Sequence, residues 1–487
     1  MRTLRPLIVL LALALPATAT AFCGFFVSGA DAELYNDASQ VVLMRKGNRT
    51  VMSMSNTYKG PPQDFALVVP VPTVLHEEDV KTLPTDVFDH VDKLSAPRLV
   101  EYWEQDPCYV EPPRTMMMKS GGRGGMVPSA PGGARDAELG VKVEARFEVG
   151  EYQIVILSAK QANGLDTWLR ENKYRIPEGA AGALAPYISD GMKFFVAKVN
   201  IKKVKRDAQG VVVLSPLRFT FESDTLRLPV RLGLLNAQGA QDLLVYVLHP
   251  TARFEVANYP NLFIPTNVEV LDKVRDSFGA FYVSLFDAAL ARAGGRGVVT
   301  EYAWQTTGCD PCPVPPLTDA DLATLGGDLF GIGGQPAGLA VPPGKGAPRG
   351  RNAPFFGPAS SWVLTRLHTR YGKETLSEDL VFREAKAITG GRAQWGGQSV
   401  EQPGEVQDAQ TNNFQGRYII RHYWKGEVKC DEPQYGRWGG PPGGGAAPTS
   451  AATGLATAPR GAIKLTDVVT SKLDVLGLPG IPPPKRR

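Results

Sequence analysis

The sequence lacks a strong net charge and, beyond its first residues, a long apolar run. The formal net charge is +4 over 487 residues, and removal of an N-terminal segment that holds Arg2 and Arg5 leaves 4 − 2 = +2. So small an excess of basic residues does not predict binding to nucleic acid or to an anionic membrane. No stretch after residue 21 is long enough to cross a bilayer as a helix. We therefore expect no transmembrane helix in the mature chain.

The sequence also lacks the motifs of common enzyme classes. His76-Glu77 has no second histidine four residues on, as the zinc-protease helix requires. No Gly-x-Ser-x-Gly elbow is present, and Gly344-Lys345 lacks the upstream glycine and the following Ser or Thr of a phosphate-binding loop. The five histidines are dispersed. We expect no metal and no cofactor, and any catalytic residues stay unknown.

The N-terminus has the pattern of a secretory signal peptide. Two arginines precede an apolar run from Leu7 to Leu15, and Ala19-Thr20-Ala21 is a small-x-small cleavage site. We expect cleavage after residue 21 and a soluble protein in the periplasm, at the cell surface or in the medium. The alternatives are an uncleaved anchor, for which the apolar run is short, and a lipid anchor on Cys23, for which the preceding Phe22 is unusually large.

Five cysteines are present: Cys23, Cys108, Cys309, Cys312 and Cys430. In an exported protein, such cysteines are typical of structural disulfides. The spacing of Cys309 and Cys312 is also that of redox-active pairs, but the prolines that follow prevent the helix start that lowers a thiol pKa. Two pairings remain open. Cys108 bonds Cys312, which leaves Cys309 for Cys23 or Cys430, or Cys309 and Cys312 bond each other.

One segment of the chain recurs. Residues 63–73, from Gln63-Asp64 to Pro72-Thr73, match residues 241–251, from Gln241-Asp242 to Pro250-Thr251. Each copy is followed by a helical pattern, a strand with Glu-Tyr, and Asp-Pro-Cys. This order predicts an internal duplication of a hairpin-strand-helix-strand unit. The fold class that we expect is α+β, with mainly antiparallel sheets, packed helices and long Gly/Pro-rich loops.

Composition and periodicity divide the chain into seven segments. Helices are expected at 77–94, where Pro84 interrupts the pattern, and at 270–293, which has the strongest apolar periodicity. The segments are a signal peptide (1–21), a first α+β unit (22–110), a flexible insertion (111–136), a second, larger unit (137–313), a Gly/Pro-rich linker (314–360), C-terminal strands that complete the core (361–431) and a disordered tail (432–487).

One group of residues, a strip of basic side chains, has the chemistry of a binding site. In an expected strand at 361–371, Arg366, His368 and Arg370 alternate and therefore share one face. Arg417 and Arg421 share a face of an expected strand at 414–428. If these strands pair, a basic strip crosses the sheet and can bind a polymer that bears carboxylates or phosphates. The alternative is an ordinary solvated sheet face.

Several short motifs are informative in combination. They are Cys23-Gly24-Phe25-Phe26, Asp64-Phe65 leading to Pro70-Val71-Pro72, Leu157-Ser158-Ala159 with Trp168-Leu169, Cys309-Asp310-Pro311-Cys312, Thr365-Arg366-Leu367-His368, Glu378-Asp379-Leu380, and Phe414-Gln415-Gly416-Arg417-Tyr418. Together these motifs resemble those of a bacterial family of exported proteins, the domain-of-unknown-function family 2330 (DUF2330). The resemblance runs from about Cys23 to Cys430. It implies export and brings no catalytic residues.

These observations lead to one hypothesis with two alternatives. We expect an exported envelope protein that acts as a non-enzymatic binding or structural module, with an envelope polymer or protein as its partner. The first alternative is a thiol–disulfide protein that uses Cys309 and Cys312. The second is a hydrolase whose site is assembled from distant residues.

Overall fold

The computed structural model describes most of the chain between residues 39 and 481. The described residues are 25–26, 39–55, 66–108, 141–172, 174, 179–206, 212–235, 240–333, 360–372, 374–395, 398–401, 404–453, 455, 458–478 and 480–481. The predicted signal peptide, the predicted insertion and Cys23 lie outside them. The described chain is α+β, with mixed sheets and few helices, as expected for the class.

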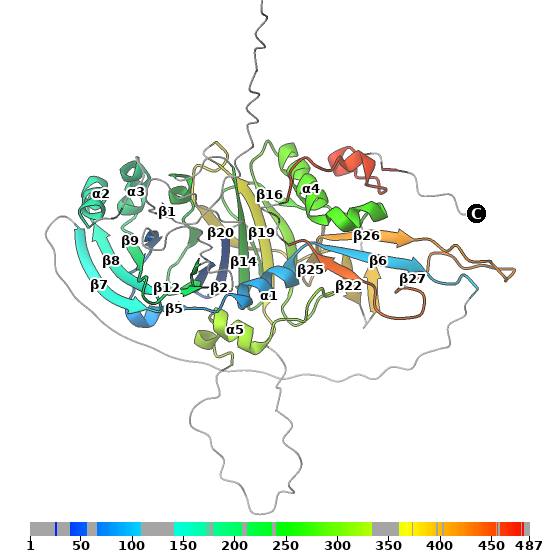
Figure 1. Ribbon diagram of the computed structural model, residues 1–487, viewed down its shortest axis with the longest axis horizontal. Helices are drawn as coiled ribbons and strands as arrows, with labels where there is room; N and C mark the ends of the chain where they lie inside the picture. The colour runs from blue at the N-terminus through cyan, green and yellow to red at the C-terminus, as the bar shows by residue number, and fades with distance from the viewer. Residues whose placement is uncertain are drawn as a thin grey trace, which may run out of the picture.

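A central sheet of eleven described strands organises the molecule (Figure 1). Its order is β24-β21-β25-β18-β19-β14-β2-β3-β12-β5, and β16 also pairs with β18. The strands are β2 (Ser39–Lys46), β3 (Arg49–Ser55), β5 (Val80–Thr82), β12 (Leu217–Glu222), β14 (Gln241–His249), β16 (Asn261–Phe263), β18 (Val298–Gln305), β19 (Val363–Tyr371), β21 (Ile388–Gly390), β24 (Gln407–Asp408) and β25 (Asn413–Gln415).

Strand β14 lies in the middle of this sheet. All nine of its residues are buried, because the sheet is covered on both faces. It pairs antiparallel with β19 and parallel with β2. The central sheet therefore takes strands from both predicted α+β units and from the segment 361–431, which contributes β19, β21, β24 and β25.

A second sheet packs on one face of the central sheet. It consists of β1 (Phe25–Phe26), β4 (Ala66–Val71), β9 (Lys193–Val199), β8 (Tyr152–Ala159) and β7 (Val141–Val149), in that order. Alternate residues of its strands, such as Leu67, Ile154 and Phe195, meet Leu43 and Val245 of the central sheet in the largest apolar core. This arrangement is a sandwich of two sheets, in which period-two side chains interdigitate.

Helices cover the outer faces of both sheets. Helices α2 (Ala162–Glu171) and α3 (Ala180–Ser189) lie on the outside of the second sheet (Figure 1). Helices α1 (Asp86–Ser95) and α5 (Asp319–Leu325) cover the other face of the central sheet. None of the helices in the described part of the chain has the length and apolar character that crossing a membrane requires.

Helix α4 (Phe278–Arg292) is apolar on nearly all sides and is correspondingly buried. It packs on β18 and on β26 (Arg417–His422), and the C-terminal segment covers it (Figure 1). The helix expected at 270–293 is thus confirmed, with a 3-10 turn η4 (Asp272–Ser277) as its first part. The helix expected at 77–94 begins only after Pro84; residues before it form η2 (Glu77–Asp79) and β5.

The remaining strands form small sheets around this core. One has the order β17 (Val268–Glu269), β26, β6 (Arg98–Glu104) and β27 (Trp438–Gly439), and β28 (Thr449–Ala451) also pairs with β6. A second has the order β13 (Leu226–Leu228), β20 (Leu380–Ala385) and β15 (Arg253–Val256). Two further sheets have two strands each: β10 (Lys205–Arg206) with β11 (Val212–Val213), and β22 (Arg392–Trp395) with β23 (Gln398–Glu401). Further 3-10 turns are η3 (Arg231–Leu235), η5 (Gly327–Phe330), η6 (Leu465–Asp467) and η7 (Asp474–Leu476).

The C-terminal segment differs from the expectation of disorder. Its described part contributes six buried residues to the apolar core around α4, namely Ala452, Leu455, Val468, Val469, Leu473 and Leu476. Backbone hydrogen bonds tie it to the core, for example from Leu271 N to the Val468 carbonyl at 2.9 Å. Its Gly/Pro-rich composition correctly disfavours long regular elements, but isolated apolar residues still bury themselves. The prediction of a disordered tail is therefore wrong for this part.

The two copies of the recurring motif occupy different places. Strand β4 of the first copy belongs to the second sheet, whereas β14 of the second copy lies in the central sheet. Their closing strands, β6 and β18, also belong to different sheets. The structure does not place the copies equivalently, so the duplication stays a prediction from the sequence.

Candidate functional site

The basic side chains of β19 do share one face, as their alternation predicts, but they do not form a surface strip. Strand β19 pairs with β14 and β18, whereas β26, which carries Arg417 and Arg421, pairs with β6 and β17. The strands that the strip requires are therefore not neighbours in the described chain. Arg366, His368 and Arg417 are buried, and Arg421 forms an ion pair with Glu269 at 3.1 Å. The predicted basic strip is wrong.

Instead, Arg366 and His368 lie in a buried cluster of charged groups. The acidic partners come from three elements: Asp92 from α1, Asp242 from β14 and Glu301 from β18. Glu301 sits where the register of β18 against β19 shifts, between Thr300 and Tyr302. Such a bulge changes the direction in which a side chain points. Here the carboxylate of Glu301 points toward the basic residues of β19.

The contacts within the cluster are short. Arg366 donates from Nε to Glu301 Oε2 at 2.5 Å and from Nη1 to Asp92 Oδ1 at 2.6 Å. The His368 ring contacts Glu301 Oε1 through Nδ1 at 2.7 Å and Asp242 Oδ1 through Nε2 at 3.2 Å. Phe286 of α4 stacks on the imidazole at 4.0 Å between ring centroids. Arg366 and Glu301 are both 0% exposed and His368 is 1% exposed, so water does not reach them.

The cluster holds its members in their charged forms. Burial alone would raise the pKa of Glu301, but the charges of His368 and Arg366 outweigh it and lower the pKa to about 2. Burial alone would lower the pKa of His368, but Glu301 and Asp242 raise it above its usual value. The ring is then an imidazolium that donates from both nitrogens to carboxylates. Each buried charge has an opposite charge beside it, which is the condition for burying it at all.

Two further residues complete the cluster at its rim. Arg370 of β19 and Arg460 of the C-terminal segment both contact Asp242 Oδ2, at 3.1 and 2.7 Å. Arg460 also forms an ion pair with Asp287 of α4. The cluster therefore joins α1, α4, the central sheet and the C-terminal segment. The charges at its centre are buried and paired with opposite charges, so the centre offers no open position for a reacting molecule.

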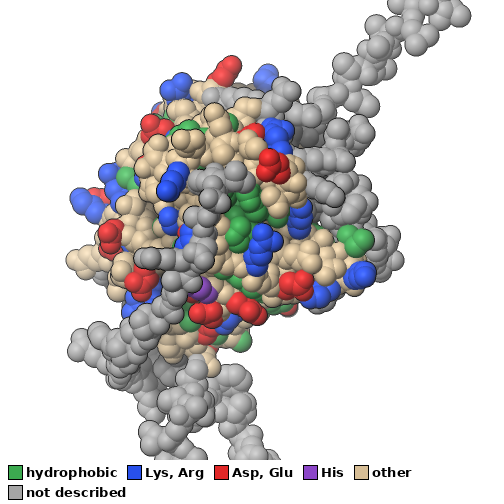
Figure 2. All heavy atoms as spheres, turned by 90° about the vertical axis from the view of Figure 1, so that its left-hand side faces the viewer, with side chains coloured by type: hydrophobic (Ala, Val, Ile, Leu, Met, Phe, Trp, Pro, Cys, Tyr) green, Lys and Arg blue, Asp and Glu red, His purple; other side chains and the backbone are tan. Residues whose placement is uncertain are grey.

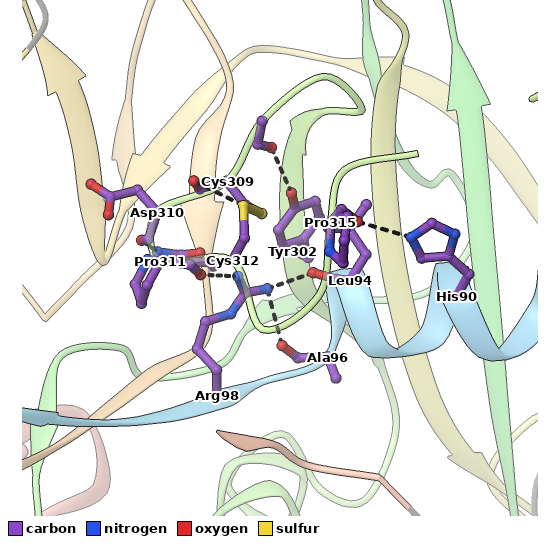
Figure 3. The surroundings of a disulfide bond; sticks show 12 residues. His90, Leu94, Ala96, Arg98, Tyr302, Cys309, Asp310, Pro311, Cys312 and Pro315 are labelled. Carbon is purple, nitrogen blue, oxygen red and sulfur yellow. Dashed lines mark hydrogen bonds between the residues drawn. A yellow bond between two sulfur atoms is a disulfide. The ribbon is translucent and has the colours of Figure 1, made fainter. Parts of the chain in front are cut away.

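The Cys309–Cys312 loop is the second predicted site, and the two cysteines bond each other (Figure 3). Arg98 of β6 reaches into this loop. It donates from Nη1 to the Pro311 carbonyl at 2.8 Å and from Nη2 to the carbonyls of Leu94 and Ala96, at 2.8 and 3.1 Å. The loop is thereby attached to the end of α1 (Figure 3).

Arg98 is fully buried, and the acceptors of these three hydrogen bonds are carbonyls. Burial lowers its pKa to about 10, although the Tyr302 ring opposes this effect. Its charge is accommodated because the C-terminal carbonyls of a helix form the negative end of the helix dipole. Arg98 therefore acts as a cap for α1 and as an anchor for the disulfide loop.

Other contacts fix the loop around the disulfide. The Gln415 amide donates to the Asp310 carbonyl. The His90 ring contacts the Pro315 carbonyl at 2.8 Å (Figure 3). Cys309 is 8% exposed among apolar neighbours, while Cys312 is exposed. Apolar burial raises the pKa of a thiol and makes it a poor leaving group. These observations favour a structural bridge over a redox-active one.

The other described disulfide joins Cys108 to Cys430, across 322 residues of sequence. Of the two pairings that the sequence left open, the structure has the local Cys309–Cys312 bridge, and the Cys108–Cys312 pairing is wrong. The reason is topological. Cys108 follows β6 and Cys430 follows β26, and these strands are parallel neighbours. The sequence does not reveal which strands pair, so it could not give this bridge.

A pocket that sequence reasoning missed opens at one edge of the sandwich. It has a volume of about 300 Å³ and lies between Met52 of β3, Phe221 of β12, Pro70 of β4 and Met192 before β9. Asp190 and Arg227 also line this pocket. A shallower depression of about 470 Å³ lies over β8 and α2. No cluster of His, Cys, Asp or Glu suited to hold a metal ion occurs in the described parts of the chain.

The charges at one end of the molecule are mixed. Figure 2 shows the end formed by α2, α3 and β7, where Lys and Arg side chains alternate with Asp and Glu. Several are mutually paired, for example Lys203 with Glu148 at 2.7 Å and Arg170 with Asp166 at 2.8 Å. This end therefore carries no field of one sign that would attract an anionic polymer.

Comparison with known proteins identifies the family. A family model described as an uncharacterized protein conserved in bacteria (DUF2330) matches residues 16–383. The match covers most of the chain, so the protein belongs to this family, as the sequence motifs indicated. No curated protein and no solved structure matches the chain. The match ends before β25, β26 and the C-terminal segment that carries Arg460.

Proposed function

We propose that the protein is exported and acts outside the cytoplasm as a non-enzymatic binding or structural module. The Cys108–Cys430 bridge carries this proposal. It joins two segments that only the folded chain brings together, and disulfides of this kind persist in oxidising compartments. The secretory pattern of the first 21 residues independently supports export.

The buried charge cluster supports a non-enzymatic role. Catalytic acids and bases need access to a substrate and a pKa near the working pH. Glu301 and His368 are instead buried and mutually paired, and the pKa of Glu301 lies at about 2, far below neutral pH, because of its cationic neighbours. Their chemistry is that of a fixed ion-pair network.

Fractionation and cysteine mapping of the native host protein test the proposal. The mature protein should begin at Phe22 and be recovered outside the cytoplasm. A peptide that contains Cys108 should be disulfide-linked to one that contains Cys430. Recovery in the cytoplasm with both cysteines reduced would overturn the proposal. A lipid modification on Cys23 would show that the exported protein is anchored to a membrane and not soluble.

One observation favours the thiol–disulfide alternative: Cys312 is exposed. An external thiolate that attacks Cys312 Sγ would form a mixed disulfide and expel Cys309 as a thiolate. A second thiol would then release the dithiol and a new disulfide. Titration with dithiothreitol, compared with Cys309→Ser, tests this path. Because the leaving sulfur is buried among apolar residues, we expect the bridge to resist reduction in the folded state.

A further inference from the structure

The pocket between the sheets has an apolar floor. Met52 of β3, Phe221 of β12 and Met192 before β9 line it. Met52 belongs to the main apolar core, so the pocket is an opening of that core toward the surface. Methionine side chains adapt to ligands of different shape because they are flexible and polarisable.

The walls of the pocket are poor in hydrogen-bond donors. Pro70, Pro72 and Pro229 line it, and proline has no backbone N–H. The polar residues of the lining are Asp190, Ser223, Thr225 and Arg227, and the Ser223 hydroxyl already donates to the Thr225 carbonyl at 2.8 Å. The volume of about 300 Å³ is at the small end of ligand sites. The part of the pocket between Met52, Met192 and Phe221 therefore suits one compact apolar group, while the rest of the lining includes the polar side chains.

One anion and one cation lie together at this pocket. Arg227 donates from Nη1 to Asp190 Oδ2 at 2.5 Å. Their side chains are 34% and 49% exposed, so solvent and ligands reach both. An ion pair this exposed contributes at most about 1 kcal/mol. A ligand that offers both a carboxylate and an ammonium group can therefore open the pair at little cost.

The position of Asp190 is unfavourable on local grounds. It is the C-cap residue of α3, and its N–H bonds the Pro186 carbonyl at 3.0 Å. The carbonyls at this end of a helix repel a carboxylate and favour a cation.

From these features we propose that the pocket binds a free α-amino acid with an apolar side chain. The α-carboxylate accepts hydrogen bonds from Arg227, the α-ammonium donates to Asp190, and the side chain fills the space between Met52, Met192 and Phe221. A bidentate guanidinium–carboxylate contact fixes the orientation of the ligand. This inference rests on the proposed function as a binding module, and it names the class of ligand that the module binds.

Isothermal titration of the purified mature protein with L-leucine, L-methionine and L-phenylalanine tests the proposal. Leucinamide lacks the carboxylate and N-acetyl-leucine lacks the ammonium. We expect saturable binding of at least one amino acid, and at least tenfold weaker binding of both blocked analogues. Absence of binding at 10 mM of every amino acid would overturn the proposal, as would equal binding of the blocked analogues, which would indicate a merely apolar pocket.

Variants at the two charges sharpen the test. Arg227→Gln and Asp190→Asn should each weaken binding about tenfold or more, while thermal unfolding stays near that of the wild type. Arg383→Gln is the matched control, because Arg383 is also exposed and paired, with Glu255, but does not line the pocket. Unchanged affinity in both folded pocket variants would overturn the proposal. Purified protein binds or fails to bind whatever its compartment, so this outcome is separate from the test of export.

Discussion

Glu301 is the residue on which the buried charge cluster depends. It contacts Arg366, His368 and Tyr282, and all four side chains are buried. Glu301→Gln leaves two buried cations without their common partner, so the free energy of unfolding should fall by about 3–5 kcal/mol. Urea denaturation measures this loss.

The matched control is Glu222→Gln. Glu222 also pairs with an arginine, Arg49 at 3.4 Å, but both side chains are exposed. Removal of this exposed pair should change the free energy of unfolding by about 1 kcal/mol or less. If the two variants lose similar stability, Glu301 does not have the central role that its contacts indicate.

The same cluster predicts how stability depends on pH. The pKa of Glu301 is lowered on folding, to about 2, so its contribution is present above pH 4.5 and is lost as the pH falls toward 2. The pKa of His368 is raised on folding, so its contribution is present below about pH 6.5 and is lost as the pH rises through the raised value. Melting temperatures should therefore decline on the alkaline side, as the pH rises above 6.5 and through the raised pKa of His368.

His368→Gln should remove that alkaline decline, because the variant has no proton to lose at this position. Its melting temperature should be lower than that of the wild type at pH 6, and the difference should shrink as the pH rises. An unchanged alkaline slope in the variant would assign the decline to other groups.

At the scale of single residues, the sequence predicted part of this cluster. Period-two alternation placed Arg366, His368 and Arg370 on one face, and the structure confirms it. The acidic partners could not be found in the same way, because they lie on a helix and on two strands whose pairing with β19 is non-local. Without Asp92 and Glu301, basic residues on a strand look like a surface strip.

Among the elements, the junction between α1 and the disulfide loop depends on Arg98. Arg98→Ala removes three hydrogen bonds to carbonyls and leaves a cavity, so it should cost about 3 kcal/mol or more. Hydrogen exchange should become faster in the last turn of α1 and in residues 308–317. Arg170→Ala serves as the control, because its exposed i,i+4 pair with Asp166 contributes only about 0.3–0.5 kcal/mol.

If exchange accelerated in only one of these two regions, Arg98 would be a local cap and would not link them. Arg98→Met separates the roles of shape and charge. It preserves much of the side-chain volume but leaves the three carbonyls without a donor, so a loss close to that of the alanine variant would assign the effect to hydrogen bonding.

The sequence predicted elements better than their pairing. The apolar periodicity of 270–293 gave α4, and the alternation of 361–371 gave β19 almost to the residue. The region before Pro84 was misassigned, because three consecutive acidic residues suit a helix start but here form one 3-10 turn followed by β5. Apolar spacing cannot distinguish these outcomes over so few residues.

For the molecule as a whole, the two disulfides should contribute different amounts to the free energy of unfolding. The Cys108–Cys430 bridge closes a loop of 322 residues, so in the chain-entropy model its removal costs about 5 kcal/mol. The Cys309–Cys312 bridge closes a loop of three residues and should contribute about 1–2 kcal/mol. Thermal unfolding of the paired serine variants, Cys108→Ser with Cys430→Ser and Cys309→Ser with Cys312→Ser, compares them directly.

A larger loss from the second pair would show that native contacts around the Cys309–Cys312 loop, and not the entropy of the unfolded chain, dominate.

The parallel pairing of β6 with β26 has a consequence for how the chain is made. Arg98 lies opposite Arg417, so β6 pairs with a strand that lies 417 − 98 = 319 residues further along the chain. Contacts this distant in sequence make folding slow. During synthesis, the first hundred residues emerge from the ribosome without their neighbour, and the nascent chain cannot complete its core until nearly all of it has been translated. If the protein is exported, as proposed above, this late pairing favours passage through a translocation channel before the core forms.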